Sequence, residues 1–172
     1  MTEKLKICMV GATGVGKTSL VSRFVQSAFS DRYETTIGVK ILRRRVVQGG
    51  QDIELVVWDL SGEDEFQHVQ PAYLRGALGY LLVADGTRPE TLDVAKTLHA
   101  RAQAAIGAVP MVLVLNKADL VSAWQVRERE ERVAEERGWP VVRASAKTGE
   151  GVERAFDLLV AAIRERGRPA WI

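Results

Sequence analysis

The stretch Gly11-Ala12-Thr13-Gly14-Val15-Gly16-Lys17-Thr18 fits the phosphate-binding pattern G-x-x-x-x-G-K-[ST] at every fixed position. An apolar run at 5–10 precedes it and a helical pattern over 19–28 follows it, which is the order of strand, loop and helix that the pattern needs. Backbone N–H groups of such a loop and the positive end of the helix dipole bind anionic oxygens. The stretch therefore predicts a phosphate site, and the flanking pattern disfavours the alternative, a glycine turn that caps an ordinary helix.

Length, charge and cysteine content exclude few function classes. At 172 residues, we expect a single domain over 1–172. The 24 basic and 22 acidic residues nearly balance, so charge gives no argument for binding nucleic acid or an anionic membrane. Cys8 is the only cysteine and lies in the first apolar run, which favours a reducing compartment. Because no apolar leader or membrane-spanning run is present, we expect a cytoplasmic protein.

Apolar runs that alternate with helical patterns or turns predict a mainly parallel sheet with helices on both faces. Gly49-Gly50 separates two strand patterns and predicts a hairpin, which makes one edge strand antiparallel. The spacing from Thr87 to Glu90 matches a capping box and predicts a helix start there. Further helices are expected over 127–137 and 151–166. The apolar runs are 5–10, 53–58, 80–84, 111–115 and 141–144.

Two polar clusters follow buried strands, where ligands bind in such sheets. Asp59 ends one strand and is a candidate Mg²⁺ ligand beside the Thr18 hydroxyl. On its own, the Asp59-x-x-Gly62 spacing is more typical of a strand-end turn. Asn116-Lys117-Ala118-Asp119 follows another strand, and a carboxylate there can accept two hydrogen bonds from guanine that adenine cannot offer. The cluster therefore predicts guanine selectivity.

Together these residues resemble the small GTPases of the Ras superfamily over essentially the whole chain. Two details, the segment Thr36-Ile37-Gly38-Val39 and the pair Trp58-Asp59, look most like the Rab branch and also like the GTPase domains of Roco proteins. The resemblance implies an α/β fold of the P-loop NTPase type, with three layers, a six-stranded mainly parallel sheet and five helices. The matching motifs are 11–18, Thr35-Thr36-Ile37-Gly38, Trp58-Asp59-Leu60-Ser61-Gly62, 116–119 and Ser145-Ala146-Lys147.

The resemblance also implies binding of GTP and GDP with Mg²⁺, hydrolysis of GTP, and switch loops at about 30–40 and 60–76 that select protein effectors, exchange proteins and activating proteins. In such proteins Phe29 packs against guanine, Tyr33 closes over the phosphates, and Thr36 contacts Mg²⁺ and the γ-phosphate. The implied catalytic residues are Glu63, Lys17 and Thr36, and the implied Mg²⁺ ligands are Thr18, Thr36 and Asp59. The implied nucleotide contacts are Thr13, Gly14, Val15, Gly16, Lys17, Thr18, Ser19, Phe29, Tyr33, Thr36, Gly62, Asn116, Lys117, Asp119, Leu120, Ser145, Ala146 and Lys147.

Glu63 stands where the family has the glutamine that orients the attacking water. An ionised glutamate only accepts hydrogen bonds and is repelled by a γ-phosphate, which predicts slow hydrolysis. A second hypothesis, weighted equally, is that Glu63 positions the attacking water as a hydrogen-bond acceptor, which would alter GTP turnover but not abolish it. A protein that binds GTP and scarcely hydrolyses it is the second functional hypothesis, and an ATP-dependent phosphotransferase is a third, disfavoured by the cluster at 116–119.

Three other departures lead to expectations. Thr13 lies where an activating protein's arginine would enter. Its side chain either argues against activation by an inserted arginine or is simply tolerated at the surface. The final residues 164–172 contain no cysteine, so we expect no direct lipid anchor, and this ending is compatible with a prokaryotic member or an excised domain. Arg43-Arg44-Arg45 on the edge strand either blocks strand aggregation or forms a docking surface for an acidic effector.

Overall fold

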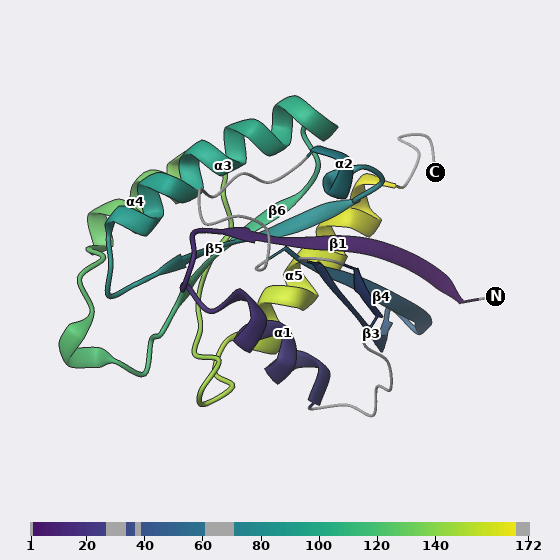
Figure 1. The fold of residues 1–172 in the computed structure, drawn as a ribbon, viewed down its shortest axis with the longest axis horizontal. Coiled ribbons are helices and arrows are strands. Elements are labelled where there is room, and N and C mark those ends of the chain that lie inside the picture. The colour runs from purple at the N-terminus through teal and green to yellow at the C-terminus, as the bar shows by residue number, and fades with distance from the viewer. Residues whose placement is uncertain (1, 27–33, 37–38, 61–70, 168–172) are drawn as a thin grey trace.

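A seven-stranded sheet with the order β2-β3-β4-β1-β5-β6-β7 runs through the molecule (Figure 1). The computed structural model describes residues 2–26, 34–36, 39–60 and 71–167. β4, β1, β5, β6 and β7 are parallel to one another, whereas β3 is antiparallel to β4 and β2 is antiparallel to β3. The strands are β1 (Glu3–Gly11), β2 (Glu34–Thr36), β3 (Val39–Gln48), β4 (Gln51–Asp59), β5 (Gly79–Asp85), β6 (Met111–Asn116) and β7 (Val141–Arg143).

Helices cover both faces of this sheet, which gives three layers (Figure 1). α1 and α5 pack on one face, where the Phe24 and Phe156 rings stack with centroids 3.8 Å apart. α2, α3 and α4 pack on the other face. The helices are α1 (Lys17–Gln26), α2 (Pro71–Leu74), α3 (Glu90–Ile106), α4 (Glu128–Glu136) and α5 (Val152–Arg166), with a short 3₁₀ turn η1 at Val121–Ala123.

The predicted α/β fold with a mainly parallel sheet and five helices is confirmed. The six predicted strands are β1 and β3 to β7, and the three-residue β2 adds one more at the edge. The predicted hairpin is also confirmed, because Gln48 pairs with Gln51 across Gly49-Gly50.

The predicted capping box at Thr87 and Glu90 is wrong, although a helix does begin at Glu90. No side chain caps α3. The Thr87 hydroxyl instead donates to Asp85 Oδ1 at 2.7 Å, and so does the Thr87 backbone N–H at 2.8 Å. The buried carboxylate therefore takes the hydroxyl that the spacing had assigned to the helix end.

The three arginines at 43–45 do not form one exposed surface. Arg44 lies on the face that α1 and α5 cover, with its guanidinium 4.0 Å from the centroid of the Phe24 ring. Arg44 Nη1 also donates to the Phe24 carbonyl at 2.8 Å and to Glu153 at 2.5 Å. A docking surface that includes Arg44 is therefore wrong, because this side chain joins β3 to two helices.

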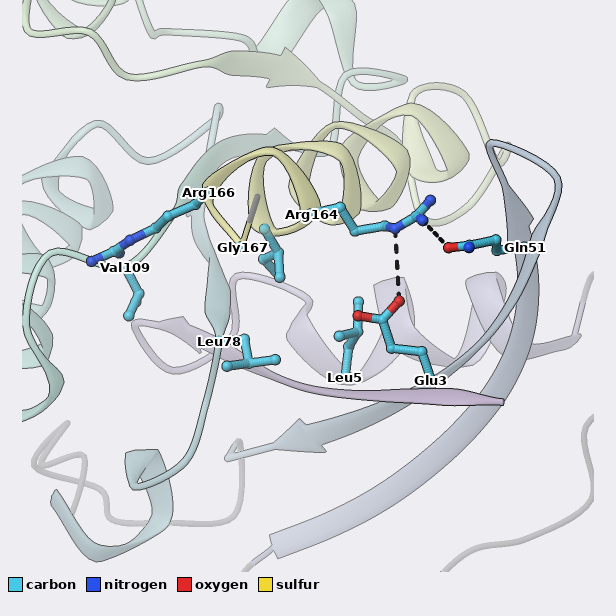
Figure 2. Close-up of a pocket in the computed structure, with 9 residues that line it drawn as sticks. Glu3, Leu5, Gln51, Leu78, Val109, Arg164, Arg166 and Gly167 are labelled. Atoms are coloured by element: carbon cyan, nitrogen blue, oxygen red, sulfur yellow. Dashed lines mark hydrogen bonds and ion pairs between the residues drawn. The ribbon is translucent and has the colours of Figure 1, made fainter. Parts of the chain in front are cut away.

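The two ends of the parallel strands differ in character. Their carboxyl ends carry Gly11, Asp59, Asp85 and Asn116. Their amino ends border a cavity of about 600 Å³ beside the end of α5, where Arg164 pairs with Glu3 (Figure 2). This cavity lies at the opposite end of the sheet from the phosphate loop and from Asn116. Among the described residues, no helix is long and apolar enough to cross a membrane.

Candidate functional site

The phosphate loop connects the end of β1 to the start of α1, as the sequence predicted. Lys17 begins α1 and is only 6% exposed. Its Nζ donates to the carbonyl oxygens of Gly11 at 2.5 Å and Ala12 at 2.8 Å. Burial lowers the pKa of Lys17 to about 8, although the charge of Asp59 opposes this shift. The lysine is thus held over the loop that is predicted to bind phosphate.

Thr18 and Asp59 meet beside this loop. The Thr18 hydroxyl donates to Asp59 Oδ2 at 2.7 Å, and Asp59 is 1% exposed at the end of β4. A hydroxyl and a carboxylate are oxygen donors of the kind that Mg²⁺ prefers, and Mg²⁺ usually binds through few protein groups. The two residues fit the predicted role of metal ligands. No cluster of three or more His, Cys, Asp or Glu side chains suited to a metal occurs in the described part of the chain.

Asn116 at the end of β6 holds the middle of the phosphate loop. Its Nδ2 donates to the Val15 carbonyl at 2.9 Å, and its Oδ1 accepts from the Ala146 N–H at 3.2 Å. A Cβ at position 16 would lie 2.3 Å from Asn116 Nδ2, and Gly16 has a φ of +96°. Only glycine fits at position 16, because the asparagine approaches the backbone closely there and because this φ strains other residues.

Lys117 and Asp119 continue from Asn116. Among the described residues other than glycine, Lys117 alone has a positive φ, at +69°. Its Nζ donates to the Gly14 carbonyl at 3.1 Å. The hydroxyl of the fully buried Ser145 donates to Asp119 Oδ1 at 2.7 Å and so orients this carboxylate. The motifs at 116–119 and 145–147 therefore form one unit with the phosphate loop. For 116–119 this proximity was expected from its place at a strand end.

The remaining predicted site residues fall into three groups. Ser19 and Thr13 are exposed, Leu120 is 43% exposed, and the Lys147 carbonyl accepts from Arg23 at 3.3 Å. Their roles in binding stay predictions. The structure gives only the backbone of Thr36, in β2. Phe29, Tyr33, Gly62 and Glu63 lie outside the described residues.

Asp85, a fully buried carboxylate at the end of β5, was not predicted as a site residue from the sequence. Its Oδ2 lies 2.8 Å from Lys117 Nζ and 3.0 Å from Arg88 Nε. Burial alone would raise the pKa of Asp85, but hydrogen bonds from Lys117, Thr87 and Arg88 outweigh it and lower the pKa to about 2. The available signal was an acidic residue that ends a buried strand, the same signal that identified Asp59.

Comparison with known proteins agrees with this geometry. The family model described as "Ras family" matches residues 6–165. The chain belongs to the Ras family. The maize GTP-binding protein YPTM2 is 36% identical over 163 residues, which cover 94% of this chain and 80% of the relative. Human Ras-related protein Rab-25 is 38% identical over 160 residues, covering 90% and 74% of the two chains. GTP-binding protein ypt2 of Schizosaccharomyces pombe is 35% identical over 164 residues, covering 94% and 82%.

As a Rab-like member of the Ras family, the chain is a small GTP-binding protein that acts as a GTPase switch. It binds GTP and GDP, and it works with effector and regulator proteins. The prediction of a Ras-superfamily, Rab-like protein is confirmed. The findings do not favour the alternative of weak or absent hydrolysis, and an ATP-dependent phosphotransferase has no support among them. Prokaryotic origin stays a prediction.

Proposed function

We propose that this GTPase switch needs Mg²⁺ and, on its own, hydrolyses GTP slowly. The observation that supports the metal requirement is the 2.7 Å contact between Thr18 Oγ1 and Asp59 Oδ2 beside the phosphate loop. When bound, Mg²⁺ supplies positive charge next to the β- and γ-phosphate oxygens. Thr18 and Asp59 would hold it, and Lys17 would bind the outer phosphates.

The slow rate is proposed from Glu63, which lies outside the described residues. An ionised carboxylate beside the γ-phosphate is repelled by it and cannot donate a hydrogen bond to the developing charge. An uncharged glutamine at the same position would not be repelled, and it could both orient the attacking water and donate a hydrogen bond to the developing charge. The alternative, in which Glu63 holds the attacking water as an acceptor, predicts turnover that does not rise when glutamine replaces it.

The switch loops at about 30–40 and 60–76 would select partners according to the bound nucleotide. Thr36 and Gly62 would contact the γ-phosphate and release it after hydrolysis. A cytoplasmic location belongs to the same proposal, since the one cysteine, Cys8, is a buried free thiol in β1.

Single-turnover hydrolysis of bound GTP tests this function. The purified protein is compared with Glu63→Gln, with and without a chelator of Mg²⁺, and Glu128→Gln on the exposed face of α4 is the matched control. We expect slow, Mg²⁺-dependent turnover that Glu63→Gln accelerates and Glu128→Gln leaves unchanged. Turnover that falls or stays equal in Glu63→Gln would refute the slow-rate argument. No turnover until glutamine is introduced would instead indicate a GTP-locked protein.

A further inference from the structure

Five successive carbonyl groups of the phosphate loop each accept a hydrogen bond from a side chain. Lys17 takes the first two, at Gly11 and Ala12. The next three, at Thr13, Gly14 and Val15, accept from Arg88 Nη2 at 3.2 Å, Lys117 Nζ at 3.1 Å and Asn116 Nδ2 at 2.9 Å.

The direction of these three carbonyls decides where the loop N–H groups point. In a trans peptide unit the C=O and N–H bonds point in opposite directions. The peptide units that begin at Thr13, Gly14 and Val15 therefore turn their N–H groups away from the three donors. Those N–H groups belong to residues 14, 15 and 16, and such groups form the anion cradle of a phosphate loop.

Arg88 is the one donor of the three that comes from outside the guanine motif, since it follows β5. Its Nε binds Asp85 Oδ2 at 3.0 Å while its Nη2 reaches the Thr13 carbonyl. The same Asp85 oxygen lies 2.8 Å from Lys117 Nζ. One buried carboxylate thus fixes two cations that bind neighbouring carbonyls of the loop.

We propose that Asp85 and Arg88 are positioning residues that hold the phosphate loop ready for nucleotide, with Asp85 linking the guanine-side lysine to the arginine at Thr13. Both act through the loop backbone and contact no nucleotide atom in this scheme. The Arg88 side chain is 40% exposed and the Asp85 side chain is 1% exposed. The buried carboxylate therefore anchors an arginine that is partly in contact with solvent. The inference rests on nucleotide binding at this loop and is independent of Mg²⁺ or of the rate at Glu63.

A test compares release of fluorescent GDP from the wild type, Arg88→Ala, Arg88→Lys and the control Arg132→Ala. Arg132 is an exposed arginine on α4 that pairs with Glu128 at 3.7 Å. We expect GDP to leave Arg88→Ala about tenfold faster, as the loss of about 1.4 kcal/mol would produce. Lysine offers one nitrogen where arginine offers separate ones for Asp85 and Thr13, so Arg88→Lys should restore the rate only in part.

The affinity ratio of GDP to GMP separates positioning from general weakening. GMP carries one phosphate and makes fewer contacts with the loop, so Arg88→Ala should weaken GDP more than GMP. A further variant, Asp85→Asn, tests whether the two residues act together. Arg88→Ala should accelerate GDP release less in the Asp85→Asn background than in the wild type, because the effects of the two substitutions are coupled. Equal losses for GDP and GMP, additive effects, or a rate like that of Arg132→Ala would each overturn the proposal. A wild type that fails to bind GDP would instead refute the nucleotide-binding function itself.

Discussion

Replacing Asp85 by asparagine should destabilise the nucleotide-free protein, and the loss should depend on pH. The pKa of Asp85 falls from its ordinary 3.8 to about 2 in the folded protein. Burial opposes this shift, and hydrogen bonds from Lys117, Thr87 and Arg88 outweigh it. At 1.36 kcal/mol per pKa unit, the ionised Asp85 carboxylate contributes about 2.4 kcal/mol to the free energy of unfolding at neutral pH.

The sign of the pH dependence follows from the lowered pKa. The unfolded chain binds a proton at Asp85 more readily than the folded protein does, so acid favours unfolding. The stabilisation is fully present well above pH 3.8 and is lost as the pH falls toward 2. At pH 3, roughly half of it remains by the same relation.

Urea unfolding followed by circular dichroism measures this contribution. The wild type, Asp85→Asn and the control Asp93→Asn are compared at pH 7 and at pH 3. Asp93 lies on α3 with its side chain 81% exposed, so its substitution should cost little at either pH. We expect Asp85→Asn to lower the free energy of unfolding clearly at pH 7 and by a smaller amount at pH 3. A cost equal at the two pH values, or equal to that of Asp93→Asn, would refute the assignment of Asp85 as a buried ion-paired carboxylate.

Two further predictions concern the two faces of the sheet. Phe24→Ala removes a fully buried ring from its stack on Phe156, which should cost about 3–5 kcal/mol and lower the melting temperature by roughly 10 °C, with Phe24→Leu losing less. His99 is buried with its Nδ1 2.7 Å from the Tyr80 hydroxyl, and burial lowers its pKa. The wild type should therefore lose stability as the pH falls below about 6.5, and His99→Gln should lose less over the same range in urea titrations.

Much of the fold could be predicted because its signals are local. Apolar runs marked β1 and β4 to β7, and the turn at Gly49-Gly50 predicted the hairpin that adds β3. The three-residue β2 escaped prediction because Glu34-Thr35-Thr36 carries no apolar run, and its strand form comes from pairing with β3. The packing of the Arg44 side chain against α1 and α5 was also not predicted, because it depends on helices that are distant from β3 in the chain.

The candidate site could be predicted where a polar residue able to bind a ligand lies at the carboxyl end of a strand. Asp59 and Asn116 both end parallel strands, and the topology of the sheet brings those ends to the phosphate loop. The orienting contacts were not predictable, because they depend on side-chain directions across loops. The contact between Ser145 and Asp119, for example, joins segments that follow two different strands. The roles of Phe29, Tyr33, Gly62 and Glu63 stay predictions.

The error at Thr87 has a physical cause that also explains why Asp85 was missed. Spacing alone made Thr87 a helix cap, because a threonine hydroxyl can accept from a helix N–H. The same hydroxyl can donate, and Asp85 is a fully buried acceptor only two residues away. An ionised carboxylate without partners in the interior costs far more than an uncapped helix end that water can reach. The hydroxyl therefore goes to the carboxylate, and the carboxylate, once satisfied, can hold Arg88 and Lys117 at the phosphate loop.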